Sequence, residues 1–514
     1  MAPGPSRMVP EPISRVSASG SVRGDDLWDL SNASLARTGS ADGGRRKAAG
    51  RRALRWAVTA IPCLGMIAVL AAAVLLPAGL GSAGRVSLFA FGLAVILWTA
   101  TDFNAAYVAL AAVLLLVVTG AVPQQRLFDS LASDVVWLMI GAFVLGAAIQ
   151  SSGLAGRLTR LVAERANNVG QMFWLMTTAL LPLSFLVPST SGRAAVALPV
   201  FRAVSDAAGD ARVTRALALL VPTVILVSTV STLIGAGSHL VANDLLERVA
   251  GRRIGFAEWL LYGLPFGIAA AYLSCFVVLW LFLDKERRRR PLSVTTAPVV
   301  AFSRPEWTTL GVTGVMVAFW LTEAWHGLET ATVAVLGAAV LTMPGAGPLS
   351  WKQGLKAVEW NLIVFVGAAL VLGQALIETG AAEWVVARLF DVAGFGQDSS
   401  RPFVLLGLAF LTLTSHAYMT SHTARAAALV PSLLYLAKAL ELNPVAVMFI
   451  GTVGMDYALT FPVSSKALLM FQELDRETWQ PSDLLRLSAI LLPLHAALIL
   501  AFYYGWWQWV GLAL

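Results

Sequence analysis

Apolar residues fill stretches of membrane-spanning length over most of this chain, separated by short polar segments. A helix that crosses a bilayer needs about 20 mainly apolar residues, and such stretches recur from Trp56 to the C-terminus. They predict eleven helices, near residues 56–80, 86–101, 104–121, 135–163, 214–246, 257–283, 306–322, 329–343, 359–390, 443–471 and 483–511. One such stretch would fit the core of a soluble protein, but this series indicates an all-α polytopic membrane protein.

Two further apolar stretches, near 170–204 and 402–437, are each interrupted at the middle by Ser, Thr and Arg. Broken backbone at membrane depth persists only where protein, water or a ligand satisfies its polar groups. We therefore expect two re-entrant hairpins here rather than two crossings.

The two interruptions are copies of one pattern, residues 189–199 (STSGRAAVALP) and 421–431 (SHTARAAALVP). A second pair of similar segments precedes them in the same order, 137–146 (WLMIGAFVLG) and 361–373 (NLIVFVGAALVLG). Two matched features in one order indicate an internal repeat. About five crossings, an odd number, separate the two interruptions, so the hairpins should enter from opposite sides and the repeats should be inverted.

The chain is expected to have five parts. These are a disordered basic cytoplasmic tail (1–52), a first transmembrane helix (53–84), a first inverted repeat (85–284), a cytoplasmic linker (285–304) and a second inverted repeat (305–514). Lys and Arg gather at 157–165, 202–215 and 285–290, which this topology places in the cytoplasm, as the positive-inside rule requires. The C-terminus, with Trp506, Trp507 and Trp509, then lies on the outer side of the cell's inner membrane.

Composition supports lipid as the solvent, because 57% of residues are hydrophobic and 13% are charged, against roughly a quarter charged in soluble domains. The net charge of +7 does not indicate nucleic acid, since the basic residues lie at the ends of apolar segments. Cys63 and Cys275 each lie inside an apolar segment, so neither a disulfide nor a thiolate metal site is supported. No cofactor is expected, and a sodium ion is left open.

The hairpin tips carry chemistry suited to an anion. Helix N-termini and hydroxyls favour negative groups, and a guanidinium from each half could hold an oxygen pair of a carboxylate or sulfate. Two such cations predict a small divalent anion as substrate, and snorkelling of each Arg to the surface is the alternative. The expected substrate-binding residues are Ser189, Thr190, Ser191, Arg193, Ser421, His422, Thr423 and Arg425. His422 could instead carry a coupling proton.

A polar break containing Gly or Pro follows each hairpin. Unwinding there would free carbonyls to coordinate a cation, whereas a helix kink without a ligand is the alternative. The residues expected to bind a coupling ion, or to substitute for its charge, are Thr232, Gly235, Gly237, Ser238, Pro462, Ser464, Ser465 and Lys466.

These motifs resemble those of the divalent anion/sodium symporter family, the dicarboxylate, citrate and sulfate carriers of the ion-transporter superfamily. That family carries Ser-Asn-Thr at each hairpin tip, where this chain has residues 189–191 and 421–423. It also has an unwound Thr-x-Ile-Gly-Thr-Pro-Pro-Asn stretch, which residues 232–239 resemble loosely. The resemblance covers about residues 85–511. It implies eleven spans with two hairpins, a homodimer through scaffold domains, and elevator-like movement of a transport domain.

The chain departs from the family at positions that matter for coupling. Thr190 and His422 replace the hairpin Asn residues, which in the family contact substrate and lie beside the sodium sites. Lys466 lies where a sodium-coordinating loop is expected, and its ammonium would repel a nearby cation while supplying the same charge. In having an Arg after each motif, the chain resembles the sodium-independent citrate and 2-oxoglutarate/malate exchangers of the superfamily. We therefore expect secondary active transport of a di- or tricarboxylate, with at least one sodium site lost.

Other functions are less consistent with this sequence. A sodium- or proton-coupled symporter of sulfate or another inorganic anion is the main alternative, and a passive anion channel is a weaker one. An intramembrane enzyme needs a nucleophile with a positioned base, but the adjacent residues Ser421 and His422 lie on different helix faces. No phosphate-binding Gly-Lys-Ser/Thr loop occurs, so ATP-driven pumping by this chain alone is not expected.

Overall fold

The computed structural model describes residues 63–74, 79–101, 103–154, 157, 162, 164–187, 189–292, 301–393, 401–474 and 478–514. The expected tail, 1–52, lies outside them. The chain divides into two units, Met1–Leu64 and Gly65–Leu514. The described residues of the second unit are mainly helical, and their one extended pairing is an isolated bridge between Asn168 and Pro291.

Many of the described helices are apolar and long. Seven could cross a bilayer by length and composition: Ser82–Ala100, Gln125–Ser152, Val169–Leu186, Ala211–Ser231, Phe256–Phe282, Trp360–Glu378 and Pro481–Trp509. Five shorter apolar helices accompany them: Cys63–Val74, Ala105–Val118, Thr330–Leu341, Arg401–Ala417 and Pro444–Asp456. The all-α polytopic architecture predicted from the sequence is confirmed, and the protein is a multi-pass membrane protein.

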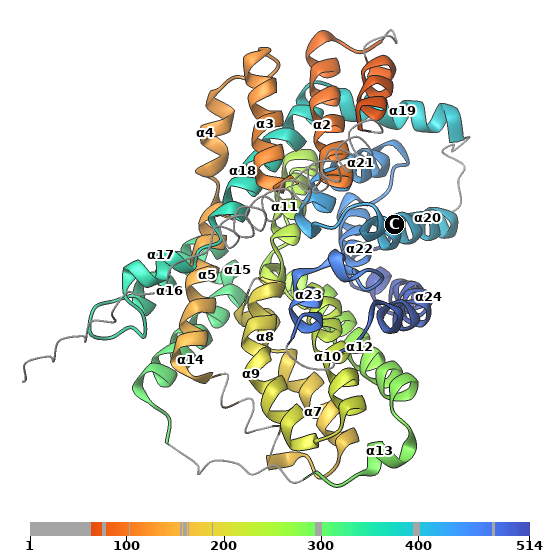
Figure 1. Ribbon diagram of the computed structural model, residues 1–514. Coiled ribbons are helices and arrows are strands. Elements are labelled where there is room, and N and C mark those ends of the chain that lie inside the picture. The colour runs from red at the N-terminus through yellow and green to blue at the C-terminus, as the bar shows by residue number, and fades with distance from the viewer. Residues whose placement is uncertain are drawn as a thin grey trace, which may run out of the picture. The chain divides into compact units, whose positions relative to one another are not determined.

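Each of the two interrupted stretches forms a pair of helices that meet at a turn (Figure 1). In the first, α7 (Val169–Leu180) and the short α8 (Leu183–Leu186) precede α9 (Thr190–Ala208). In the second, α20 (Arg401–Thr414) and the turn η3 (Ser415–Ala417) precede α21 (His422–Ala439). We call these helix pairs the first and second hairpin.

The second helix of each hairpin begins with the same cap. Ser189 and Ser421 have extended backbones, with ψ of 129° and 121°. The Ser189 Oγ accepts a hydrogen bond from the Gly192 N–H, and the Ser421 Oγ accepts one from the Ala424 N–H. Because a Ser side chain satisfies a free N–H of the first turn, it favours a helix start at this point. The Ser at the same position in both copies of the motif is thus explained by its role as a helix cap.

A broken helix follows each hairpin. In the first half, α10 (Ala211–Val227) is joined to α11 (Gly237–Ala250) by the 3₁₀ turns η1 (Thr229–Ser231) and η2 (Leu233–Gly235). In the second half, α22 (Pro444–Asp456) is followed by η4 (Pro462–Ser464) and α23 (Lys466–Gln472). A Cβ added at Gly235 would lie 2.1 Å from the Thr229 carbonyl oxygen, so only Gly fits this turn. The helices expected at 214–246 and 443–471 are therefore each two helices.

The two halves interlock through these elements. In Figure 1, α11 lies beside α21 and α18 (Trp360–Glu378), and it also packs against α22. In turn, α23 packs against α9 and α10. The broken helix of each half thus contacts the hairpin of the other half, and this brings residues of both repeats to one place.

The remaining helices surround this centre. Helix α18 packs against α2 (Ser82–Ala100), α3 (Ala105–Val118) and α4 (Gln125–Leu131), and α5 (Asp134–Ser152) packs against α14 (Arg304–Leu321) and α16 (Thr330–Leu341). The others are α12 (Phe256–Phe282), α13 (Lys285–Arg289), α15 (Glu323–His326), α17 (Trp351–Ala357), α19 (Ala381–Ala393), α24 (Pro481–Gly505) and η5 (Trp507–Trp509). Large apolar side chains such as Phe276 and Trp280 are more than half exposed, as expected for surfaces that face lipid.

Candidate functional site

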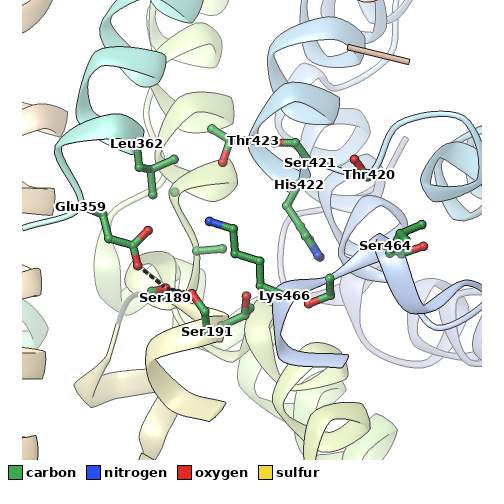
Figure 2. A pocket seen from close by; sticks show the side chains of 15 residues that line it. Ser189, Ser191, Glu359, Leu362, Thr420, Ser421, His422, Thr423, Ser464 and Lys466 are labelled. Carbon is green, nitrogen blue, oxygen red and sulfur yellow. Dashed lines mark hydrogen bonds between the residues drawn. The ribbon is translucent and has the colours of Figure 1, made fainter. Parts of the chain in front are cut away.

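A cavity of about 290 Å³ lies where both hairpin tips meet both helix breaks (Figure 2). Its volume is close to the lower limit of small-molecule sites. It is lined by Ser189, Thr190, Ser191, Ala236, Gly237, Glu359, Leu362, Thr420, Ser421, His422, Thr423, Val463, Ser464, Ser465 and Lys466. Ten of the sixteen site residues expected from the sequence are in this wall. The cavity is thus built from matched segments of the two repeats.

The tip of the first hairpin presents three consecutive hydroxyls to the cavity, from Ser189, Thr190 and Ser191. The Ser189 and Ser191 Oγ atoms lie 2.9 Å apart. Helix α9 begins here, so the N–H groups of its first turn and the positive end of its dipole lie near the cavity. This combination of hydroxyls and a helix N-terminus suits a negatively charged oxygen.

The second half contributes a matching tip and a cation. Ser421, His422 and Thr423 line the wall at the start of α21. Both ring nitrogens of His422 are buried without a hydrogen-bond partner among the described residues. In Figure 2, the Lys466 side chain extends from the start of α23 into the space between the two tips. Donors from opposite sides therefore converge on one small volume.

Arg193 and Arg425 lie outside the cavity wall, which differs from the expectation that they hold substrate oxygens directly. Both side chains are 0% exposed, so neither snorkels to a surface. Arg193 Nη2 donates to the Gly235 carbonyl (2.8 Å) and to Thr229 Oγ1 (2.9 Å). Arg425 Nη1 donates to the Tyr457 carbonyl (3.1 Å). Four residues after the tip Ser, each Arg points to the break that follows its own hairpin instead of to the cavity.

Four residues expected to bind an ion are also not part of the wall: Thr232, Gly235, Ser238 and Pro462. Thr232 Oγ1 donates to the Ser184 carbonyl at 2.8 Å, so it joins the first break to its hairpin. Gly235 supplies the carbonyl that accepts from Arg193. The Ser238 Oγ is buried without a described partner, and Pro462 begins η4. These residues shape the breaks, whereas Gly237, Ser464, Ser465 and Lys466 reach the cavity.

A buried contact between a His and an Asp, which the sequence analysis missed, joins the two breaks. His239 Nε2 lies 2.8 Å from Asp456 Oδ2, and His239 Nδ1 lies 3.0 Å from the Thr232 carbonyl oxygen. The two side chains are 0% and 4% exposed. Asp456 is an acidic residue within an apolar stretch, and an intramembrane charge is expensive unless paired or functional. The acidic residue was therefore a signal that the sequence carried, but nothing in the sequence indicated that His239 is its partner.

Glu359 is the second residue that the sequence analysis missed. It lies directly before α18, and its Oε1 accepts a hydrogen bond from the Ser189 Oγ at 3.1 Å. Among the described residues of the cavity wall, Glu359 alone is acidic and Lys466 alone is a Lys or Arg. Its position just before the repeated segment 361–373 was the only available signal.

Comparison with known proteins identifies the fold and the family. The solved structure of the Alcanivorax borkumensis YdaH transporter aligns with a TM-score of 0.54 at 16% identity, covering 74% of this chain and 88% of that one. At this identity the alignment shows a shared fold. The chain is 21% identical over 412 residues to the sodium-dependent dicarboxylate transporter SdcS of Staphylococcus saprophyticus, covering 73% of this chain and 78% of that protein.

Another relative is named as an antiporter. The chain is 20% identical over 351 residues to the citrate/succinate antiporter of Escherichia coli K12, covering 64% of this chain and 70% of that protein. The family model described as CitMHS, citrate transporter, matches residues 93–454, well over half of the chain. The protein therefore belongs to the citrate transporter family, and it is a transporter and not an enzyme.

Proposed function

We propose that this protein carries di- or tricarboxylate anions across the inner membrane by secondary transport, using the cavity between the two hairpins as its substrate site. The convergence of both hairpin tips and both helix breaks on one volume of about 290 Å³ supports this most directly. A site shared by two repeats suits a carrier, because the same residues can face either side as the repeats move. Two relatives are named as a dicarboxylate transporter and a citrate/succinate antiporter, which makes carboxylates the favoured anions.

The proposed substrate contacts are the hydroxyls of both tips, the start of α9 and of α21, and Lys466. Of the residues expected from the sequence, Ser189, Thr190, Ser191, Ser421, His422 and Thr423 lie in the wall. Arg193 and Arg425 contribute their positive charge from behind it. In a region of low dielectric this charge favours an anion without direct contact.

The two Arg residues also support transport without sodium. Helix breaks of this kind provide free carbonyls that suit a cation. Here guanidinium groups already donate to the carbonyls of Gly235 and Tyr457. We propose that these fixed charges replace coupling cations and that the protein exchanges one anion for another. One relative is named as sodium-dependent and another as an antiporter, so both modes occur among similar proteins.

The remaining features are proposals of the same kind. We place the N-terminus in the cytoplasm and the C-terminus outside, with the two hairpins entering from opposite sides. The hairpins and broken helices would form a transport domain that moves as an elevator against α18 and its neighbours. The protein would act as a homodimer.

Counterflow in proteoliposomes tests the proposal. Vesicles loaded with unlabelled citrate or succinate should accumulate the labelled anion, saturably and equally well in sodium and in choline buffer. An absolute requirement for sodium would contradict exchange without sodium. Flux that does not saturate and shows no counterflow would indicate a channel, and transport of sulfate but not of carboxylates would favour the inorganic-anion alternative.

A further inference from the structure

The Glu359 carboxylate lies in a cavity that otherwise suits negative charge. Figure 2 shows Glu359 beside the first hairpin tip, with the Lys466 side chain extending into the space between Glu359 and the second tip. The residue comes from the start of α18, whereas the other polar wall residues come from the hairpins and the breaks. An acidic group at this point has no evident use in attracting an anion.

The Glu359 side chain does not cap the helix that it precedes. It occupies the N-cap position of α18, where a side chain usually accepts from the first free N–H groups, but its side chain makes no such bond. Its Oε1 instead accepts from the Ser189 Oγ at 3.1 Å. Its Oε2 has no hydrogen-bond partner among the described residues. The carboxylate therefore has acceptor capacity free at the cavity.

A carboxylate in the wall repels every anion that binds beside it. A substrate that also donates a hydrogen bond offsets this repulsion, because the free oxygen of Glu359 can accept from a hydroxyl or an ammonium. Such a substrate would place its carboxylates near Lys466 and the tip hydroxyls. A dicarboxylate without a donor would meet the repulsion and gain no hydrogen bond from the free oxygen of Glu359.

We infer that Glu359 determines specificity and selects carboxylates that carry a hydrogen-bond donor, a hydroxyl or an ammonium, on a carbon beside a carboxylate. The inference rests on the proposed function, since it assigns the substrate class of that same cavity. It predicts that the protein prefers citrate to succinate, the two carboxylates named together for one relative, because citrate has such a hydroxyl and succinate has none. It also gives a reason for an acidic residue that repulsion alone would disfavour.

Pairs of ligands that differ by one group give the test. Affinities of the purified full-length protein are measured by calorimetry in EDTA for malate, aspartate and succinate, and for citrate and tricarballylate. The wild type should bind malate and aspartate at least tenfold more tightly than succinate. It should likewise bind citrate at least tenfold more tightly than tricarballylate. In Glu359→Ala these ratios should fall toward one, while succinate binds as well as before or better. Ratios unchanged by Glu359→Ala, or near one in the wild type, would overturn the inference.

Two further variants sharpen the result. Glu359→Gln keeps an acceptor oxygen and loses the charge, so it should keep the preference for malate and lose the preference for aspartate. Glu378→Ala removes the same charge from the other end of α18, outside the cavity, and should leave every ratio unchanged. Melting temperatures check that all variants fold.

The remaining outcomes separate this inference from the proposed function. If the wild type binds none of these carboxylates, the proposed function fails and the inference fails with it. If all bind equally well, only the inference fails. A preference that appears on adding Mg²⁺ and is lost in EDTA would indicate a cation bridging Glu359 to the substrate, and would overturn the direct hydrogen bond.

Discussion

His239 of α11 and Asp456 of α22 form a 2.8 Å contact between residues 217 positions apart, and they join the breaks of the two repeats. His239 also stacks on Trp259, with ring centroids 4.9 Å apart. Asp456 is the acidic group whose charge acts on both Arg193 and Arg425. Two guanidiniums, one carboxylate and one imidazole are therefore buried together at the two breaks.

Replacing Asp456 by Ala should destabilise the protein strongly. Removing one partner of a buried charge cluster leaves the others uncompensated, which typically costs about 3 to 5 kcal/mol. Here it leaves two guanidiniums without their acidic neighbour. Thermal unfolding of the detergent-solubilised protein, followed by tryptophan fluorescence, measures the loss.

Glu383→Ala is the control for this variant, because Glu383 is 65% exposed and its distance to Lys438 Nζ is 3.9 Å. It should change the melting temperature little, since exposed pairs contribute about 0 to 1 kcal/mol. Equal losses in the two variants would show that Asp456 does not hold the cluster together.

Arg193→Ala should create a response to sodium that the wild type lacks. The change removes the guanidinium from the Gly235 carbonyl and the Thr229 hydroxyl, two oxygen ligands of the kind sodium prefers. A cation that binds only the folded protein stabilises it, so sodium should raise the melting temperature of this variant by about 2 to 5 °C relative to choline.

The matched variant is Arg193→Lys, which keeps a positive charge in the same place and should remain insensitive to sodium. A melting temperature of Arg193→Ala that is identical in sodium and choline would mean that Arg193 does not stand in for a cation. A sodium response already present in the wild type would contradict the idea equally.

The repeated motif was enough to locate the cavity. Ser189 and Ser421 begin helices in both halves, and a Ser at a helix start is a local signal that sequence carries directly. The following segments 232–239 and 462–466 were recognisable because Gly, Pro and hydroxyls interrupt apolar stretches. Spacing along the chain therefore predicted most of the wall, as well as the helical architecture around it.

The directions of the Arg side chains and the long-range partners were not predictable in this way. Arg193 lies on α9 one turn beyond the tip, and its guanidinium donates to the Gly235 carbonyl and does not line the cavity. Glu359 meets Ser189 across 170 positions. Nothing in a single sequence pairs such residues, because the contact depends on how the halves interlock.

Lys466→Ala should weaken anion binding. Lys466 is the lysine of the cavity wall and makes no hydrogen bond to a described residue, so its ammonium is free for a ligand. A hydrogen bond to a charged group is worth about 1.5 to 3 kcal/mol when buried, and exposure reduces this, so we expect a loss of roughly tenfold in carboxylate affinity. Calorimetry measures it, with Lys438→Ala as the control at the far end of α21. Equal affinities in Lys466→Ala and the wild type would remove Lys466 from the site.

Gly235→Ala should prevent the first break from forming. The added Cβ would lie 2.1 Å from the Thr229 carbonyl oxygen, and the contact is with backbone, so no side-chain movement relieves it. The displaced turn would also lose the carbonyl that accepts from Arg193. We expect low yield of folded protein and a lower melting temperature, measured by size-exclusion chromatography with fluorescence detection. Gly311→Ala on α14 is the matched change, because a Cβ there meets no atom within 4 Å and Ala favours a helix over Gly. A Gly235→Ala protein as stable as Gly311→Ala would show that the turn does not require Gly.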